Sequence, residues 1–149
     1  MKKNQDKLAQ YIAIDDFDQA LNLISNGVGS INSTDRSGAS LLMRAVVCND
    51  ELLVRKLIEM GADVNIIDDA KYSALHFAVQ NGNRGIAVDL IKVGADVNAQ
   101  DENGNSPLLS APSRSTPEGV VMTDLLIKNG ANASLKNNYG VSYENMLKQ

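Results

Sequence analysis

Gly61-Ala62-Asp63-Val64-Asn65 occurs again, unchanged, as Gly94-Ala95-Asp96-Val97-Asn98. The two runs are 33 residues apart, and the same shift aligns residues 35–67 with residues 68–100 at twelve identical positions, among them Leu57 with Leu90. Random composition does not produce this agreement. A fixed period of this length is typical of a protein built from stacked repeats.

A third copy begins at Asp101 and ends in Gly130-Ala131-Asn132-Ala133, three residues later than the period predicts. Leu126, Ile127 and Gly130 keep their spacing, so the inserted residues lie before them, near 115–117. We therefore predict one domain over residues 1–149. Its parts are an N-terminal capping copy (1–34), three full copies (35–67, 68–100 and 101–136) and a C-terminal partial copy (137–149).

Each copy has the local signals of a turn followed by two short helices. An Asp begins the turn of the full copies, and Gly38, Gly104 and Gly140 supply the positive φ that a tight turn needs. A Ser then precedes each apolar run, where its hydroxyl can cap a helix. The second helix has apolar residues four apart, and a Gly follows its end. Such short helices need neighbouring copies to bury their apolar faces.

This pattern resembles the ankyrin repeat, through Ser73-Ala-Leu-His76-x-Ala78, Ser106-Pro-Leu108 and the two Gly-Ala-Asp-Val-Asn runs. The resemblance covers nearly the whole chain. It implies an all-α solenoid of stacked helix-turn-helix units with hairpin-like turns, and a role in binding other proteins.

Two departures from the pattern carry local predictions. Lys71 stands where the turn expects Gly, which predicts a distorted or widened turn at residues 69–72. Pro112 and the insertion predict a shortened first helix in the third copy and a new helix start at Thr116-Pro117, capped by Thr116 or Ser115.

The composition argues against catalysis. The 149 residues include a single His and a single Cys, which excludes a disulfide framework and a Cys/His zinc site. The ankyrin resemblance assigns His76 to structural hydrogen bonds, and we expect Cys48 to be a semi-buried apolar group. The paired acids are interpreted as turn and helix-cap residues. We predict no enzyme activity, no catalytic residues, no cofactor and no metal.

Charge and hydropathy bear on the partner and the compartment. The net charge of −4 argues against nucleic-acid binding, and we find no apolar stretch long enough for a signal peptide or a membrane span. We expect a cytoplasmic protein without membrane contact, monomeric when free, that binds another protein.

The resemblance places binding on the concave face, at the turn tips and the exposed side of the first helices. Carried over copy by copy, it assigns partner contacts to Arg36, Ile67, Asp69, Tyr72, Gln80, Asn81, Glu102, Asn103, Asn105, Arg114 and Tyr139. Ser113 falls at the same helix end as Arg114. Tyr72, Tyr139 and Ile67 are the expected anchors. Asp69 and Glu102 favour a basic partner.

We infer from this architecture a stoichiometric inhibitor, for example an immunity protein that neutralises a toxin. The alternative is an adaptor or scaffold that recruits a partner protein. An enzyme with a site at the 112–117 loop has the least support, because no titratable groups converge there. The uneven copies argue against a uniform designed scaffold.

Overall fold

The structure is a computed structural model that describes residues 2–112 and 114–148. Within these residues the chain is all-helical, with no β-strand beyond the isolated bridges Thr34–Ser40 and Ile67–Ser73. The helices are α1 (Lys2–Ala13), α2 (Phe17–Ser25), α3 (Leu41–Val47), α4 (Glu51–Glu59), α5 (Ala74–Gln80), α6 (Arg84–Lys92), α7 (Pro117–Lys128) and α8 (Tyr143–Met146).

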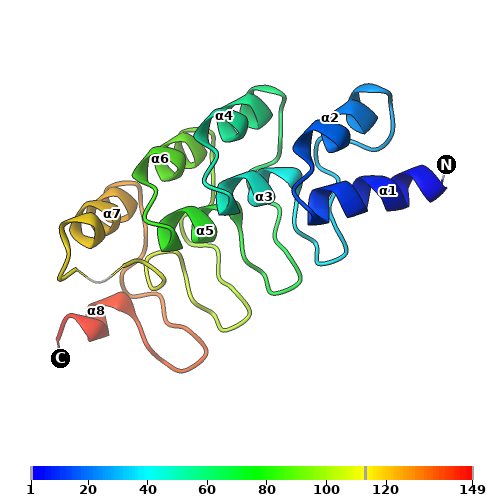
Figure 1. Ribbon diagram of the computed structural model, residues 1–149. Helices are drawn as coiled ribbons and strands as arrows, with labels where there is room; N and C mark the ends of the chain where they lie inside the picture. The colour runs from blue at the N-terminus through cyan, green and yellow to red at the C-terminus, as the bar shows by residue number, and fades with distance from the viewer. Residues whose placement is uncertain (1, 113, 149) are drawn as a thin grey trace.

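The helices form two rows that run along the chain (Figure 1). The first helices of successive copies, α1, α3 and α5, make one row, and the second helices, α2, α4, α6 and α7, make the other. Hairpin turns project beyond the first row, and the two termini lie at opposite ends of the stack. This is the predicted repeat solenoid.

The predicted capping residues start the helices. Ser40, Ser73 and Ser142 each accept a hydrogen bond from the backbone N–H three residues ahead. Asp16 and Asp50 cap α2 and α4 in the same way. Because these bonds satisfy N–H groups that have no partner inside the helix, a side-chain oxygen at this position fixes where each helix begins.

The core is an aliphatic strip between the two rows. Leu57, Leu90 and Leu126, which occupy the same position in three successive copies, are completely buried. Gly61 and Gly94 follow the second helices with φ of +84° and +97°, which lets the chain leave the helix at once. The low aromatic content of the sequence therefore reflects a core of stacked leucines and alanines.

The Asn of the repeated Gly-Ala-Asp-Val-Asn run joins one copy to the next. Asn65 accepts from the backbone N–H of Asp96 at 2.8 Å and donates to the carbonyl of Gly94 at 3.0 Å. Asn98 makes the equivalent bonds to the third copy. An amide side chain both donates and accepts, so Asn can satisfy the two backbone groups at this junction.

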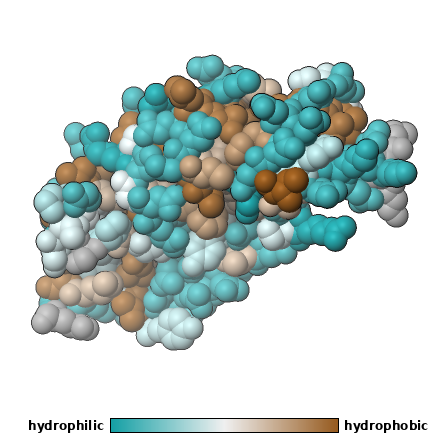
Figure 2. All heavy atoms as spheres, viewed as in Figure 1, coloured by the Kyte–Doolittle hydropathy of each residue, from teal (hydrophilic) through white to brown (hydrophobic). Residues whose placement is uncertain are grey.

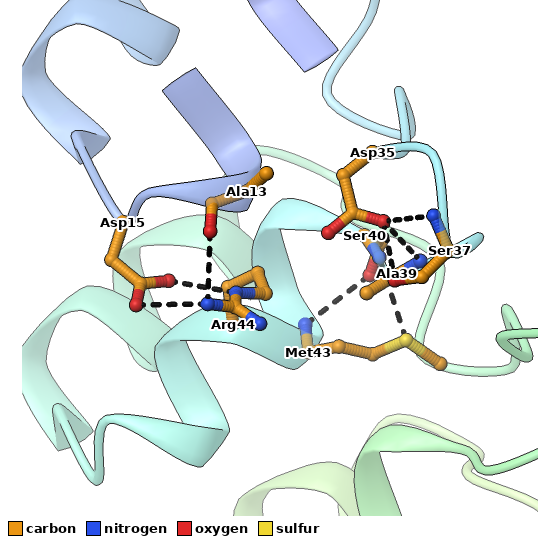
Figure 3. Close-up of polar contacts among 8 residues, drawn as sticks. All are labelled: Ala13, Asp15, Asp35, Ser37, Ala39, Ser40, Met43 and Arg44. Atoms are coloured by element: carbon orange, nitrogen blue, oxygen red, sulfur yellow. Dashed lines mark hydrogen bonds and ion pairs between the residues drawn. The ribbon is translucent and has the colours of Figure 1, made fainter. Parts of the chain in front are cut away.

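The first turn and the first inter-copy contact are drawn in Figure 3. The Asp35 carboxylate accepts from the backbone N–H groups of Ser37 at 2.8 Å and Ala39 at 3.0 Å, which closes the turn. Arg44 of α3 forms two hydrogen bonds with the carboxylate of Asp15, at 2.7 and 3.0 Å. This bidentate pair fastens the N-terminal copy to the next.

The prediction of a distorted turn at Lys71 is wrong. Lys71 itself takes a φ of +62°, and its N–H donates to the Asp68 carbonyl at 2.8 Å, as the corresponding Gly38 N–H donates to Asp35. The Asp68 carboxylate also binds the N–H of Tyr72 at 2.8 Å. These bonds together outweigh the cost of roughly 1–2 kcal/mol for a side chain in the left-handed region.

The prediction for the third copy is confirmed at its second helix. Thr116 caps α7 by accepting from the Gly119 N–H at 3.1 Å, and Pro117 is the first helical residue. The first helix is more than shortened, because residues 107–110 form only a turn, closed by a 3.1 Å bond from the Ser110 N–H to the Ser106 carbonyl. Pro112 has no N–H to extend it.

Candidate protein-binding face

The hairpin tips are tied to one another through their backbones. Each tip from the second onward donates an N–H to a carbonyl of the tip before it: Asp69 to Ser37 at 2.9 Å, Glu102 to Ala70 at 3.0 Å, and Asn138 to Asn103 at 2.9 Å. We call the turns at residues 35–39, 67–72, 101–105 and 137–141, with the exposed side of the first helices, the tip face. It contains most of the residues predicted to contact a partner, and its turns are joined by backbone hydrogen bonds in the free protein.

Several predicted contact residues are exposed on this face. Tyr139 is 74% exposed and Ile67 49% exposed, which is high for side chains of this size. Arg36, Asp69, Gln80 and Glu102 are exposed as well. The visible surface in Figure 2 is mostly hydrophilic, with separate apolar patches between the helices. Ile67 and Tyr139, the predicted anchors, are thus exposed apolar side chains on a largely polar surface.

Tyr72 does not have the exposed position expected of an anchor. Its ring stacks on Phe77 with centroids 5.4 Å apart and meets His76 edge-on at 5.5 Å. Partial burial, helped by the nearby Asp101 carboxylate, raises the pKa of Tyr72. We conclude that Tyr72 mainly supports the second turn by packing against α5.

Three asparagines that were predicted to contact a partner form side-chain hydrogen bonds between copies. Asn105 accepts from Asn137 Nδ2 at 2.8 Å, and its backbone carbonyl lies 3.1 Å from His76 Nε2. Asn81 donates to the Val46 carbonyl at 3.3 Å, and Asn103 accepts from the Tyr139 hydroxyl at 3.3 Å. Their first role in the free protein is therefore structural.

Arg114 lies apart from the tips. It pairs with Asp124 of α7 at 3.4 Å, which draws its guanidinium toward the second row of helices. The neighbouring Ser113, expected on the same face, lies outside the described residues.

The structure adds a basic region that the sequence interpretation missed. Lys3 and Lys7 of α1 line a shallow hollow with Arg36 of the first tip, and Asp6 is the acidic group among them. The signal was present in the sequence, because Lys3 and Lys7 are four residues apart and so share one side of the helix. The tip face is thus basic at its N-terminal end and carries Asp69 and Glu102 farther along.

His76 is a structural residue, as the family resemblance implied. Its Nδ1 accepts the Ser73 N–H at 3.1 Å, so Nε2 carries the proton toward the Asn105 carbonyl of the next copy. Burial lowers the pKa of His76 and keeps the ring neutral.

Cys48 is exposed, so the expectation of a semi-buried residue is wrong; it ends α3 beside a surface loop. Partial desolvation and the Asp15 carboxylate raise the pKa of the thiol, which opposes the thiolate form that a nucleophile requires. Within the described residues, no three His, Cys, Asp or Glu side chains are grouped to hold a metal ion. None of the described helices is both long and apolar enough to cross a membrane.

Comparison with known proteins agrees with this geometry. A family model for ankyrin repeats, in three copies, matches residues 8–101. An ankyrin repeat-containing protein of Treponema pallidum (strain Nichols) is 35% identical over 129 residues, which cover 86% of this chain and 42% of that protein. The chain therefore spans less than half the length of this curated relative. The stacked copies, their turns and these matches together show that the chain belongs to the ankyrin repeat family, whose members are protein–protein interaction modules.

Proposed function

We propose that this chain binds one protein partner through the tip face and acts as a stoichiometric inhibitor, an immunity-type neutraliser of that partner. The observation that carries the proposal is the exposure of Ile67 and Tyr139 on turns whose backbones are already hydrogen-bonded to one another. Rigid loops with exposed apolar side chains lose little conformational freedom on binding, so more of the contact free energy appears as affinity.

The charges on the tip face suggest how the partner is oriented. Asp69 and Glu102 would face basic groups of the partner, while Lys7 and Arg36 at the other end would face acidic ones. Exposed charges of this kind mainly change the association rate and the choice of partner. A partner with a basic region and a smaller acidic edge fits this face best.

A surface that binds without chemistry changes its partner only by covering part of it or by holding it in place. We therefore distinguish a neutraliser from an adaptor by what happens to the partner's own activity. A neutraliser abolishes that activity at one equivalent, whereas an adaptor leaves it intact in the complex.

The experiment begins with capture of the partner from a lysate of the source cell by the tagged full chain, and identification by mass spectrometry. The affinity of the purified pair is then measured for Ile67→Ala combined with Tyr139→Ala. We expect a loss of about tenfold or more, as for truncation of interface anchors. The matched control is Leu52→Ala, because Leu52 is 78% exposed on α4, in the other row of helices.

Titration of the partner's activity with the chain then tests the role. Inhibition that is complete at one equivalent supports the neutraliser. Full activity in a saturated complex contradicts it and favours the adaptor. Equal affinity of the double variant and the parent chain would show that the partner binds elsewhere.

A further inference from the structure

A second surface lies in the other row of helices, between α6 and α7. An open groove of about 520 Å³ separates these two helices. Apolar side chains from both helices line it: Val88 and Ile91 of α6, and Val121 and Leu125 of α7. Figure 1 places both helices in the row that the hairpin tips do not adjoin. We call this surface the outer groove.

The preceding pair of second helices shows how the repeat otherwise fills this place. Between α4 and α6, Arg55 and Asp89 form an ion pair at 2.7 Å. The repeat aligns Arg55 with Val88 and Asp89 with Leu125. A polar bridge between neighbouring helices is thus replaced, one copy later, by two apolar side chains that border an open groove.

Cations stand at both ends of the apolar lining. Arg84 is the first residue of α6, and Lys92 and Lys128 are the last residues of α6 and α7. None of the three forms an ion pair with any residue that the structure describes. Asp124, the acidic group at the groove, is paired with Arg114 at 3.4 Å. The rim therefore has unneutralised positive charge in a chain whose net charge is −4.

The position of Arg84 has no structural advantage. A cation in the first turn of a helix opposes the helix dipole. The preceding copy has Glu51 at the equivalent position, which the dipole favours. Lys92 and Lys128 stabilise the helix ends at which they lie, so helix stability accounts for their positions. It does not account for Arg84, whose position is better explained by contact with a ligand.

We propose that the outer groove binds an amphipathic helix of a partner protein, with its apolar side on Val88 and Leu125 and acidic residues at both ends. The eight residue steps from Arg84 to Lys92 span about 12 Å along α6, so the acidic residues of the bound helix would lie about two helical turns apart. Helices bind in grooves of this kind through apolar residues spaced three and four apart. This surface is separate from the tip face.

The probe is a fluorescein-labelled peptide of about 14 residues, with Leu at helical spacing on one side and Glu near both ends. A matched peptide has Lys in place of each Glu. Anisotropy is measured with the full chain. We expect saturable binding of the acidic peptide and binding at least about tenfold weaker for the basic one. Absence of saturation by the acidic peptide up to about 500 µM, or equal binding of both peptides, would overturn the proposal.

Variants then locate the peptide. Val88→Arg combined with Leu125→Asp copies the Arg55–Asp89 pair into the outer groove, an arrangement that the preceding helices already tolerate. We expect it to weaken acidic-peptide binding about tenfold or more with an unchanged unfolding midpoint. Lys56→Ala, at a surface lysine of α4, is the matched control and keeps the parent affinity. Unchanged affinity in the groove variant would overturn the proposal.

A charge variant covers the case in which the groove variant does not fold. Lys92→Ala combined with Lys128→Ala alters only exposed side chains and is expected to weaken the peptide several-fold, with a smaller salt dependence. Unchanged affinity would count against the proposal. A membrane surface is the alternative occupant. If the parent chain sediments with phosphatidylserine vesicles and the lysine variant does not, the groove binds a membrane and the proposal of a partner helix is overturned.

Discussion

Replacement of Lys71 by Gly should stabilise the protein, although it removes a side chain. Lys71 has a φ of +62°, and the residues at the same turn position in the neighbouring copies, Gly38 and Gly104, have φ of +79° and +78°. The hydrogen bonds of the turn are the same with either residue, because they involve the backbone and the Asp68 carboxylate. The substitution therefore isolates the backbone conformation of one residue.

The expected gain follows from two opposing terms. A side chain in the left-handed region costs roughly 1–2 kcal/mol, and Gly removes this cost. Gly also gives the unfolded chain more conformational freedom, which offsets about 0.5–1 kcal/mol of this gain. The net stabilisation is about 0.5–1 kcal/mol. With a urea dependence of about 2 kcal/mol/M, the unfolding midpoint should rise by about 0.3–0.5 M.

The measurement is urea unfolding followed by circular dichroism. Lys71→Ala is the matched control, because it removes the charged chain and keeps the Cβ that causes the strain. We expect Lys71→Ala to lie within about 0.5 kcal/mol of the parent. If Lys71→Gly is no more stable than Lys71→Ala, then the turn does not strain the residue at position 71 and the reasoning is refuted.

Three further predictions concern the stack itself. Leu90→Ala should destabilise the chain by about 2–5 kcal/mol, because it leaves a cavity where the side chain is completely buried. A smaller loss of unfolding free energy, measured in urea, would indicate that neighbouring copies collapse into the cavity. Gly104→Ala should destabilise the chain by at least about 1 kcal/mol more than Gly140→Ala, although the two glycines have a similar φ. A Cβ on residue 104 would lie 2.8 Å from the Asn138 backbone nitrogen, whereas a Cβ on residue 140 would have open space. Equal unfolding midpoints of the two variants would contradict this. Burial lowers the pKa of His76 in the folded state, so the imidazole binds a proton more readily in the unfolded chain. Stability should therefore fall as the pH drops below about 6.5. In the same urea assay, His76→Gln should reduce the loss of stability between about pH 7.5 and 5.5.

The parts of the fold that the sequence predicts are those with local causes. A Ser before an apolar run caps a helix through a bond that spans three residues, as at Ser40 and Ser73. A Gly after the second helix takes a positive φ for reasons that lie within one turn, as at Gly61. Because each copy repeats these signals, the order and the approximate ends of the helices follow from the sequence.

The parts that the sequence does not predict depend on contacts between copies. Asn105 accepts a hydrogen bond from Asn137 of the next copy, which no spacing within one copy reveals. Tyr72 is covered within its own copy, by the rings of Phe77 and His76, through side-chain packing that the residue order does not show. The turn at Lys71 is closed by its bonds to Asp68, and the Glu102 N–H of the following tip adds a bond to the Ala70 carbonyl at 3.0 Å. Residues on the tip face could thus be named from the sequence, but not which of them remain free for a partner.

Occupation of the tip face and the outer groove by one protein or by two would bear on the choice between neutraliser and adaptor. The two surfaces lie in different rows of helices, so occupation of Ile67 and Tyr139 does not require contact with Val88 and Leu125. In a stack where each copy contacts only its neighbours, binding at one surface has little means of changing the other, and the two affinities should be independent. An acidic helix held by the outer groove while a second protein occupies the tips would make this chain an adaptor. A partner whose own acidic helix reaches around to the groove would instead be held at two points. The second arrangement raises affinity through effective concentration alone, without new contacts on the tips, and it would strengthen a neutraliser.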